Sequence, residues 1–246
     1  MFEEVRQSTV TQKIISQIRT AVLKGKLQPG DKLPSEKELV EQFQVSKQSL
    51  REAMRALEQI GLIVVKKGIG GGAFIVEVDL EIVKESLTNY LYFKNLSIEN
   101  LSEFRKLIEP YAAAKVAENI NAKQLQELSE LNRSAIDHLK NDRIFEASQD
   151  EFKFHRFIAK ETNNPLLYLI LDFVESMLED FKKIFIPDKA FYKEVFNFHE
   201  RIFEAIHDRD GQRASTEMLA HVEQVERELL MLKEDMNIKQ IYVKSA

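Results

Sequence analysis

Three of the five histidines lie where they could share a metal ion with a carboxylate. Glu151 and His155 are four residues apart, so on a helix their side chains face the same way. His199 and His221 follow on later segments that could converge with this one in a helical bundle. Three imidazoles and one carboxylate suit a divalent metal ion that keeps open positions for water or a ligand. Spacing alone leaves open the alternative that these histidines are unrelated packing or surface residues.

The same four side chains could activate a water molecule, as in metal-dependent hydrolases. The sequence offers no separate general base or nucleophile beside them. It also contains no cysteine, which excludes disulfides, thiolate metal ligands and cysteine nucleophiles. We therefore expect a protein that is not an enzyme, and we keep a metal-dependent hydrolase as the alternative function.

A second charged pair has the same helical spacing. Arg105 and Glu109 are four residues apart, which by itself predicts an ordinary ion pair along one helix. Asn164 stands directly before Pro165, a combination typical of a helix start, where the asparagine side chain caps free N–H groups and proline occupies the first turn. Residue type and spacing alone give both features a structural role.

A strip of basic and amide side chains follows Ser46, a good N-cap for a helix. On that helix Lys47, Gln48, Arg51 and Arg55 spread over roughly a quarter-turn beside an apolar stripe. Arginine can bind guanine through two hydrogen bonds and glutamine can bind adenine, while lysine and the free N–H groups at a helix start suit phosphate. The strip predicts contact with duplex DNA, and an ordinary solvated helix face is the alternative.

Lysines and glycines farther along suit a loop that approaches a DNA groove. Lys66 and Lys67 end a β-branched segment, and the run GIGGG from Gly68 allows close approach of the backbone. The spacing Gly68-x-Gly70-x-x-Ala73 is similar to a dinucleotide-binding fingerprint, but that motif requires a helix after the glycines. A β-prone segment follows instead, so we do not expect a nucleotide site there.

Length and composition set wider limits. The 246 residues suffice for one large domain or two ordinary ones, and 44% hydrophobic with 30% charged residues is typical of a globular protein. Residues 1–78 carry 12 Lys and Arg against 9 Asp and Glu, whereas the rest carry 23 against 31, which suggests a polyanionic partner for the N-terminal part alone. No apolar run approaches the roughly 20 residues of a membrane span. The start MFEEVRQSTV lacks the apolar core of a secretory signal, so we expect a cytoplasmic protein with no membrane contact.

The elements that position the basic strip are predicted from periodicity and turn residues. Apolar residues at helical spacing predict a first helix over residues 9–24. Ser35 and Glu38 form a capping box that opens a short second helix, and Ser46 opens the third. LIVVKK and AFIVEV predict the two strands of a hairpin. Three helices and a hairpin form the outline of a winged helix-turn-helix, which we assign to residues 1–78.

The remaining residues, 79–246, predict helices and no convincing strand. Helical segments are expected near residues 80–93, 98–119, 122–140, 143–162, 166–185, 190–208 and 212–235. Short connections imply mostly antiparallel neighbours. The expected fold class is mainly α, with a winged helix-turn-helix followed by an all-helical antiparallel bundle of six to seven helices.

The N-terminal part resembles the winged helix of the GntR family. That family shows three blocks, G-x-L-x-P-G-x-x-L-P-S-E, then V-S-x-x-x-[VL]-R-E-A, then L-x-x-x-G-L, and all three occur in order within LKGKLQPGDKLPSEKELVEQFQVSKQSLREAMRALEQIGLIVVKKGIGGGAFI. The resemblance implies DNA contacts by Lys37, Ser46, Lys47, Gln48, Arg51, Lys67 and Gly68. Arginine is more usual at the positions of Lys37 and Lys47. Lysine keeps the charge but lacks the planar fork, which favours contact with phosphate over contact with a base.

The C-terminal part resembles the FCD ligand-binding domain of the FadR subgroup. EFKFHRFIAKETNNPLL matches D-x-x-F-H followed by N-P-L, and FHERIFEAIHDRDGQRASTEMLAHVEQV matches H-x-x-[IL]-x-x-A-I followed by a histidine 22 positions on. Many such domains hold a metal ion with one Asp and three His, which correspond here to Glu151, His155, His199 and His221. Glu151 stands where aspartate is usual. Asp150 is the neighbouring aspartate, but it precedes His155 by five residues and so lies about 140° away from it around the helix. The implied ion is divalent, with zinc first and nickel or manganese as alternatives.

The resemblance also implies a ligand. In related domains an arginine at the position of Arg105 grips the carboxylate of an effector, for which its planar fork is well shaped, and Asn164 lines the pocket. His138 and His207 match no ligand position and are predicted to be surface residues. We expect a homodimeric repressor that binds operator DNA and responds to a small organic acid. A DNA-binding architectural protein without a ligand is a further alternative.

Overall fold

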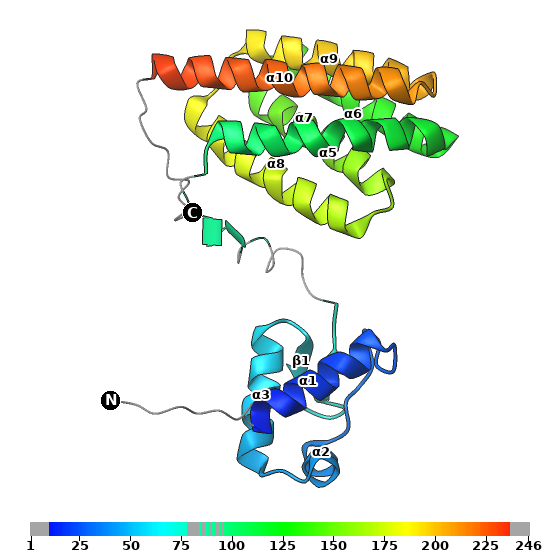
Figure 1. The fold of residues 1–246 in the computed structure, drawn as a ribbon, viewed down its shortest axis with the longest axis vertical. Coiled ribbons are helices and arrows are strands. Elements are labelled where there is room, and N and C mark those ends of the chain that lie inside the picture. The colour runs from blue at the N-terminus through cyan, green and yellow to red at the C-terminus, as the bar shows by residue number, and fades with distance from the viewer. Residues whose placement is uncertain are drawn as a thin grey trace. The chain divides into compact units, whose positions relative to one another are not determined.

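The computed structural model describes residues 10–77 and 96–236, together with residues 84, 87, 88, 90, 91 and 94. Its internal contacts divide the chain into two compact units, Met1–Ser86 and Leu87–Ala246 (Figure 1). The described residues form one apolar core cluster in the first unit and two in the second. The domain boundary predicted at residue 78 and most of the helix predicted over 80–93 fall outside the described residues. Both stay predictions.

Over residues 10–77, the first unit contains three helices and a two-stranded antiparallel sheet. The elements are α1 (Val10–Leu23), α2 (Glu36–Phe43), α3 (Lys47–Gln59), β1 (Ile63–Lys66) and β2 (Gly72–Ile75). The register pairs Ile63 with Ile75 and Lys66 with Gly72, and Lys32 adds a single bridge to Phe74 at the edge. This is the predicted winged helix-turn-helix.

Local sequence explains where the two central helices of this unit begin. The Ser35 side chain accepts a hydrogen bond from the Glu38 N–H, and the Glu38 side chain accepts one from the Ser35 N–H, which completes the predicted capping box of α2. The Ser46 side chain accepts from the Ser49 N–H and caps α3. Leu50 and Leu57 on α3 are fully buried, which fixes the opposite face of α3 toward solvent.

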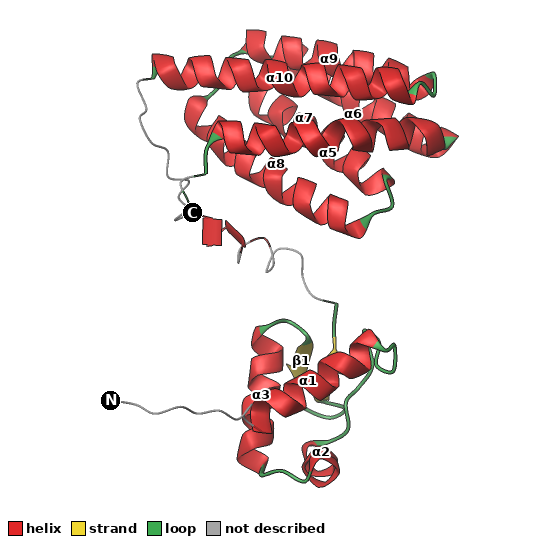
Figure 2. Cartoon of the chain, viewed as in Figure 1, coloured by secondary structure: helices red, strands yellow, loops and turns green. Residues whose placement is uncertain are grey.

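The second unit is all-helical over its described residues (Figure 2). Its helices are α5 (Ile98–Asn119), α6 (Ala122–Lys140), α7 (Ile144–Glu161), α8 (Pro165–Phe185), α9 (Lys189–His207) and α10 (Gly211–Asp235). α5 packs along α10, α6 along α7, and α9 along α10. The predicted fold class is confirmed. Every described helix lacks the length and apolar character that crossing a membrane would require.

The interior of the second unit is unusual in holding a group of charged side chains. Two apolar clusters fill most of it, with phenylalanines of α7, α8 and α9 prominent among them. Several ionisable residues are nevertheless buried, and those that concern the site are Arg105, Glu109, Glu151, His155, Glu175, Lys182, His199 and His221. Burying charge is costly unless each group is paired, so this group marks a candidate site.

Candidate functional site

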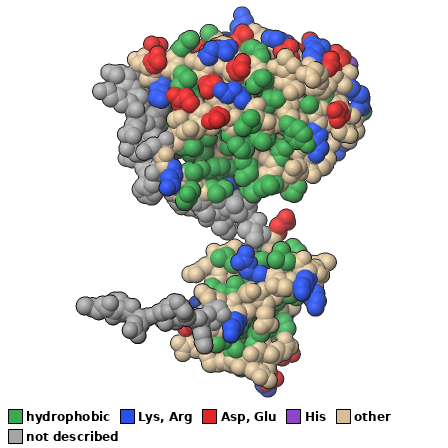
Figure 3. Space-filling view, in the orientation of Figure 1, with side chains coloured by type: hydrophobic (Ala, Val, Ile, Leu, Met, Phe, Trp, Pro, Cys, Tyr) green, Lys and Arg blue, Asp and Glu red, His purple; other side chains and the backbone are tan. Residues whose placement is uncertain are grey.

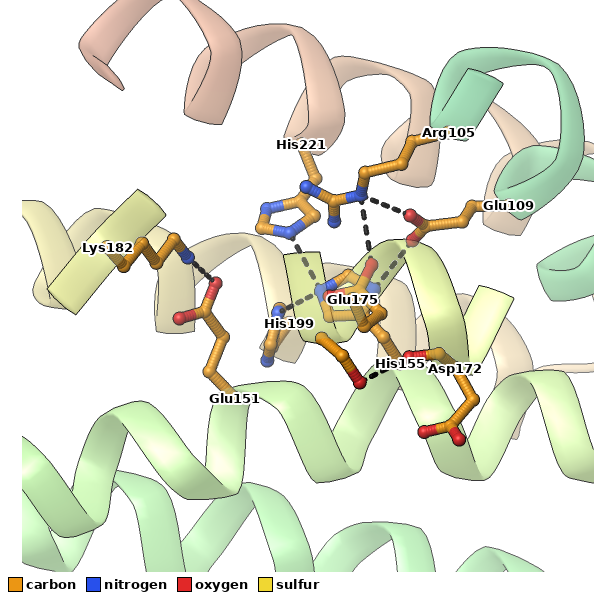
Figure 4. A network of polar contacts seen from close by, with 10 residues as sticks. Arg105, Glu109, Glu151, His155, Asp172, Glu175, Lys182, His199 and His221 are labelled. Atoms are coloured by element: carbon orange, nitrogen blue, oxygen red, sulfur yellow. Dashed lines mark hydrogen bonds and ion pairs between the residues drawn. The ribbon is translucent and has the colours of Figure 1, made fainter. Parts of the chain in front are cut away.

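Three histidines from three helices meet in the interior of the second unit. His155 lies on α7, His199 on α9 and His221 on α10, and none is more than 3% exposed. His155 Nε2 lies 3.2 Å from His199 Nε2 and 3.1 Å from His221 Nε2 (Figure 4). The ring of Phe154 stacks on His199 with 4.0 Å between centroids, so an apolar wall borders the cluster. The structure thus brings three of the predicted metal ligands together.

The geometry and protonation of this cluster fit a divalent metal ion. His155 Nδ1 lies 2.6 Å from Glu109 Oε2, a contact that points Nε2 of this ring toward the other two histidines. Burial lowers the pKa of His199 and of His221 well below the ordinary value, and nearby positive groups add to the effect, which keeps both rings neutral. Two nitrogens bound to one tetrahedral zinc ion, each at about 2.1 Å, would be roughly 3.4 Å apart. The observed separations are close to this value.

Arg105 on α5 is a buried cation with two unused donors. Its Nε donates to Glu109 Oε1 at 2.5 Å and lies 3.0 Å from Glu175 Oε1. Both terminal nitrogens, Nη1 and Nη2, are buried and find no hydrogen-bond partner among the described residues. A buried donor without an acceptor costs about 1–3 kcal/mol, so this edge of the guanidinium is suited to a ligand oxygen.

Glu109 and Glu175 flank this arginine and differ in their tendency to ionise. Burial opposes ionisation of Glu109, but the charges of Arg105 and His155 outweigh it and hold the pKa of Glu109 far below its usual range. Burial raises the pKa of Glu175, and the positive charge of Arg105 offsets this increase only in part. Helical spacing predicted only an ion pair for Glu109, and its bond to His155 gives it a second role as the group that orients a metal ligand.

Glu151, the fourth predicted ligand, lies beside the histidines but is engaged elsewhere. Its Oε1 accepts a hydrogen bond from the buried ammonium of Lys182 on α8. In the view of Figure 4 this pair lies on one side of the histidine cluster and Arg105 on the other. Two overlapping sets of described residues could share one ion, the three histidines and the trio Glu109, His155 and Glu175, and Glu151 belongs to neither. The role of Glu151 as a ligand therefore stays a prediction.

Asp150 and His138 pair with each other, away from the histidine cluster. Asp150 Oδ2 lies 3.0 Å from His138 Nδ1 and accepts from Ser134 Oγ at 2.7 Å, both on α6. The helical rotation that set Asp150 apart from His155 is confirmed. His138 was predicted to be a surface residue. Its side chain is only 22% exposed and lies against this carboxylate. His207 is 61% exposed in its side chain, as a surface residue should be.

Asn164 is the N-cap of α8. Its Oδ1 accepts from the N–H groups of Leu166 and Leu167, and the residue itself is exposed. The capping role inferred from residue type is thus present. Contact with an effector stays a prediction for this residue.

Two residues of the site were not predicted from the sequence. Glu175 and Lys182 both lie on α8 and both are at most 3% exposed. They are seven residues apart, two helical turns, and so share one face of α8. Asp172 is a third buried charge on this helix. Charged residues at helical spacing among the apolar residues of α8 were the signal that could have identified this face.

The predicted DNA-facing strip on α3 is exposed. The Lys47 and Arg51 side chains are 63% and 59% accessible, and both lie near Glu36 of α2, at 3.5 Å and 3.0 Å from its Oε1. Gln48 donates to Glu52 on the same helix. The surface ion pairs are weak, so these side chains can exchange Glu36 for another anion at low cost.

The other predicted DNA contacts are also accessible. Lys37 lies in the first turn of α2, and Lys67 and Gly68 lie in the turn between β1 and β2. Gly68 has φ +93°, a conformation that favours glycine. No described contact of these residues tests their DNA role, which stays a prediction.

Both units match models of known protein families. The chain matches the family model of the FCD domain over residues 100–224, which contains all eight buried site residues. It matches the model described as bacterial regulatory proteins, gntR family, over residues 10–74.

Curated relatives span nearly the same length as this chain. The HTH-type transcriptional regulator LutR of Bacillus subtilis (strain 168) is 33% identical over 212 residues, 82% of this chain and 93% of that protein. The galactonate operon transcriptional repressor of Escherichia coli (strain K12) is 28% identical over 227 residues, 89% of this chain and 96% of that protein. Among solved structures, Streptococcus agalactiae GntR has a TM-score of 0.68 with 26% identity, covering 89% of this chain and 99% of that one.

Proposed function

The chain belongs to the GntR family of bacterial regulatory proteins and carries an FCD domain, and from this premise we propose that it is a repressor controlled by a small carboxylate bound beside a metal ion. That it is a DNA-binding transcriptional regulator and not an enzyme follows from the family, so the hydrolase alternative is set aside. The repressor role, the metal and the carboxylate are the proposed part.

The single observation that carries the proposal is the pair of unused donors on Arg105. Nη1 and Nη2 form the flat edge that binds a carboxylate through two parallel hydrogen bonds. Glu109 and Glu175 hold Nε, so the guanidinium is fixed in place before any ligand arrives. A rigid, desolvated cation of this kind binds a carboxylate with little loss of side-chain entropy.

Three clustered imidazoles in the same buried network as this arginine support the second half of the site (Figure 4). His155, His199 and His221 would hold a divalent ion, zinc first, with Glu109 fixing the tautomer of His155. A bound ion of this kind supplies a Lewis-acid position that an effector oxygen can occupy. An acid with a hydroxyl group beside its carboxylate could bind both the Arg105 guanidinium and the metal ion. One relative is named for a galactonate operon, and galactonate is an acid of this type.

We further propose that two copies act together on DNA. A helix-turn-helix head reads one half-site, so two heads in a symmetric dimer would bind a pseudo-palindrome. Figure 3 shows hydrophobic side chains gathered over α5 and α8 of the second unit. Leu107 and Tyr111 on α5 and Leu166 on α8 are 70%, 56% and 65% exposed, which suits an interface with a second copy.

Calorimetric titration with a panel of hydroxy acids tests the proposed site. The zinc-loaded protein should bind at least one member, and Arg105→Met should lose that binding because the carboxylate loses its donors. Arg143→Met, which removes a half-exposed arginine of the same unit, serves as the control and should bind normally. Equal binding by all three proteins would remove Arg105 from the effector site.

A further inference from the structure

Lys182 and Glu151 form an ion pair inside the protein, next to the histidine cluster. The side chains are 2% and 1% exposed, and the Lys182 ammonium donates to Glu151 Oε1. A buried ion pair rarely adds net stability, because removing two charges from water costs nearly as much as their attraction returns. Its presence beside a predicted metal site therefore calls for a functional explanation.

The surroundings of Lys182 make Glu151 its main anionic partner. The ammonium faces the rings of Phe152 and Phe191 at 5.0 Å each, and Tyr192 at 6.0 Å. Aromatic faces attract a cation but do not replace a carboxylate. The Glu151 side chain is thus oriented toward Lys182, whose ammonium donates to its Oε1.

Glu151 also shares a helix face with His155, one of the three proposed metal ligands. It precedes His155 by one helical turn on α7. Its second oxygen, Oε2, is buried and has no hydrogen-bond partner among the described residues.

We infer that Lys182 is an internal competitor of the metal ion: its ammonium neutralises Glu151 in the metal-free protein and gives Glu151 up when a divalent cation joins the three histidines. The inference rests on the metal site of the proposed function. One lysine and one divalent ion share a single carboxylate, so binding of the ion by Glu151 requires the ion pair to break. Metal affinity is thereby held down and the ion becomes exchangeable.

The structure also offers a place for the displaced ammonium. Lys182 lines a cavity of about 370 Å³ together with Tyr192, Ser148 and Glu179. Glu179 is only partly buried and already lies 3.5 Å from both Lys183 and Arg156. A rotation of the Lys182 side chain into this cavity would bring the ammonium toward the carboxylate and hydroxyl oxygens there, and the charge would not remain unpaired.

Zinc affinity, measured by competition with a chromophoric chelator, tests this inference without any knowledge of the effector. Lys182→Met should bind Zn²⁺ about ten- to a hundredfold more tightly than the wild type, a change of the size commonly seen for substitutions around metal ligands. Lys123→Met is the control and should leave the affinity unchanged, because that side chain lies on α6, is 86% exposed and has no part in the network. Adding Glu151→Gln to Lys182→Met should abolish the gain.

Unchanged or weaker Zn²⁺ binding by Lys182→Met would overturn the inference. If that variant does not fold, crystal structures of the wild type with and without Zn²⁺ test the inference instead. The inference requires Glu151 to bind the metal ion and to leave Lys182. A bound ion beside an intact Lys182–Glu151 ion pair would refute it. The proposed metal site fails separately, if His199→Gln binds Zn²⁺ as well as the wild type. Absence of Zn²⁺ binding in both the wild type and Lys182→Met would refute both.

Discussion

Glu109 is the residue on which two other side chains of the site depend. One oxygen holds Arg105 and the other holds His155, so this carboxylate joins the effector-binding cation to a metal-binding imidazole. Glu175 lies farther from Arg105 Nε than Glu109 does, at 3.0 Å against 2.5 Å. The site is therefore built around an acid that would itself touch neither ligand.

Glu109→Gln should lower the free energy of unfolding by about 3–5 kcal/mol, because it leaves the charge of buried Arg105 short of a partner. Urea denaturation measures this directly. Glu103→Gln on the same helix is the control, since Glu103 is exposed, and it should change stability by less than about 0.5 kcal/mol. A Glu109→Gln protein as stable as the control would show that the network contributes little.

The buried histidines give the metal-free protein a defined pH dependence. Folding lowers the pKa of His199 and of His221. Below about pH 6.5 these two side chains therefore bind protons in the unfolded chain that they do not bind in the folded one. Stability should thus be independent of these groups above about pH 7 and fall as the pH drops below about 6.5.

Urea denaturation of chelator-treated protein at pH 7.5 and pH 5.5 checks this sign. The loss between the two pH values should be smaller in His199→Gln than in the wild type, while exposed His207→Gln should match the wild type. A loss of the same size in all three proteins would mean that the buried imidazoles titrate as they do in water.

At the scale of elements, the helices were predicted well from the sequence because their ends are encoded locally. α5 and α6 begin and end at the predicted residues, since Ser97 and Asn121 cap them with their own side chains. The partners of buried charges were not predicted in the same way. Whether Glu151 faces a histidine or Lys182 depends on how α8 packs against α7, and no local pattern contains that information.

The recognition helix α3 makes a prediction of its own. Arg51→Ala should weaken binding to a selected DNA site by roughly 1–3 kcal/mol and relax sequence preference, because arginine reads a base edge. Lys47→Ala should instead reduce the dependence of log K on log salt by about one unit, because lysine neutralises a phosphate. Fluorescence anisotropy at several salt concentrations separates the two effects. Wild-type behaviour of both variants would remove the strip on α3 from the DNA interface.

For the whole molecule, the apolar surface over α5 and α8 predicts self-association. Light scattering should give twice the 28.6 kDa of one chain for the wild type. Leu107→Asp should shift the mass toward one chain, because a carboxylate in an apolar interface loses its hydration. Phe145→Asp is the control, since Phe145 is similarly exposed on α7 and should leave the dimer intact. A dimer that survives Leu107→Asp would place the interface elsewhere.

Control of DNA binding by the buried site is tested most directly by the affinity of the full chain for its selected DNA site, with and without Zn²⁺ and the hydroxy acid that binds best. We expect a change of about 5- to 150-fold on adding the acid, the usual range of coupling between two sites. Arg105→Met should keep the ligand-free DNA affinity of the wild type and lose the response. The same DNA affinity with and without the bound acid, or an undiminished response in Arg105→Met, would contradict the claim that this buried site controls the DNA-binding unit.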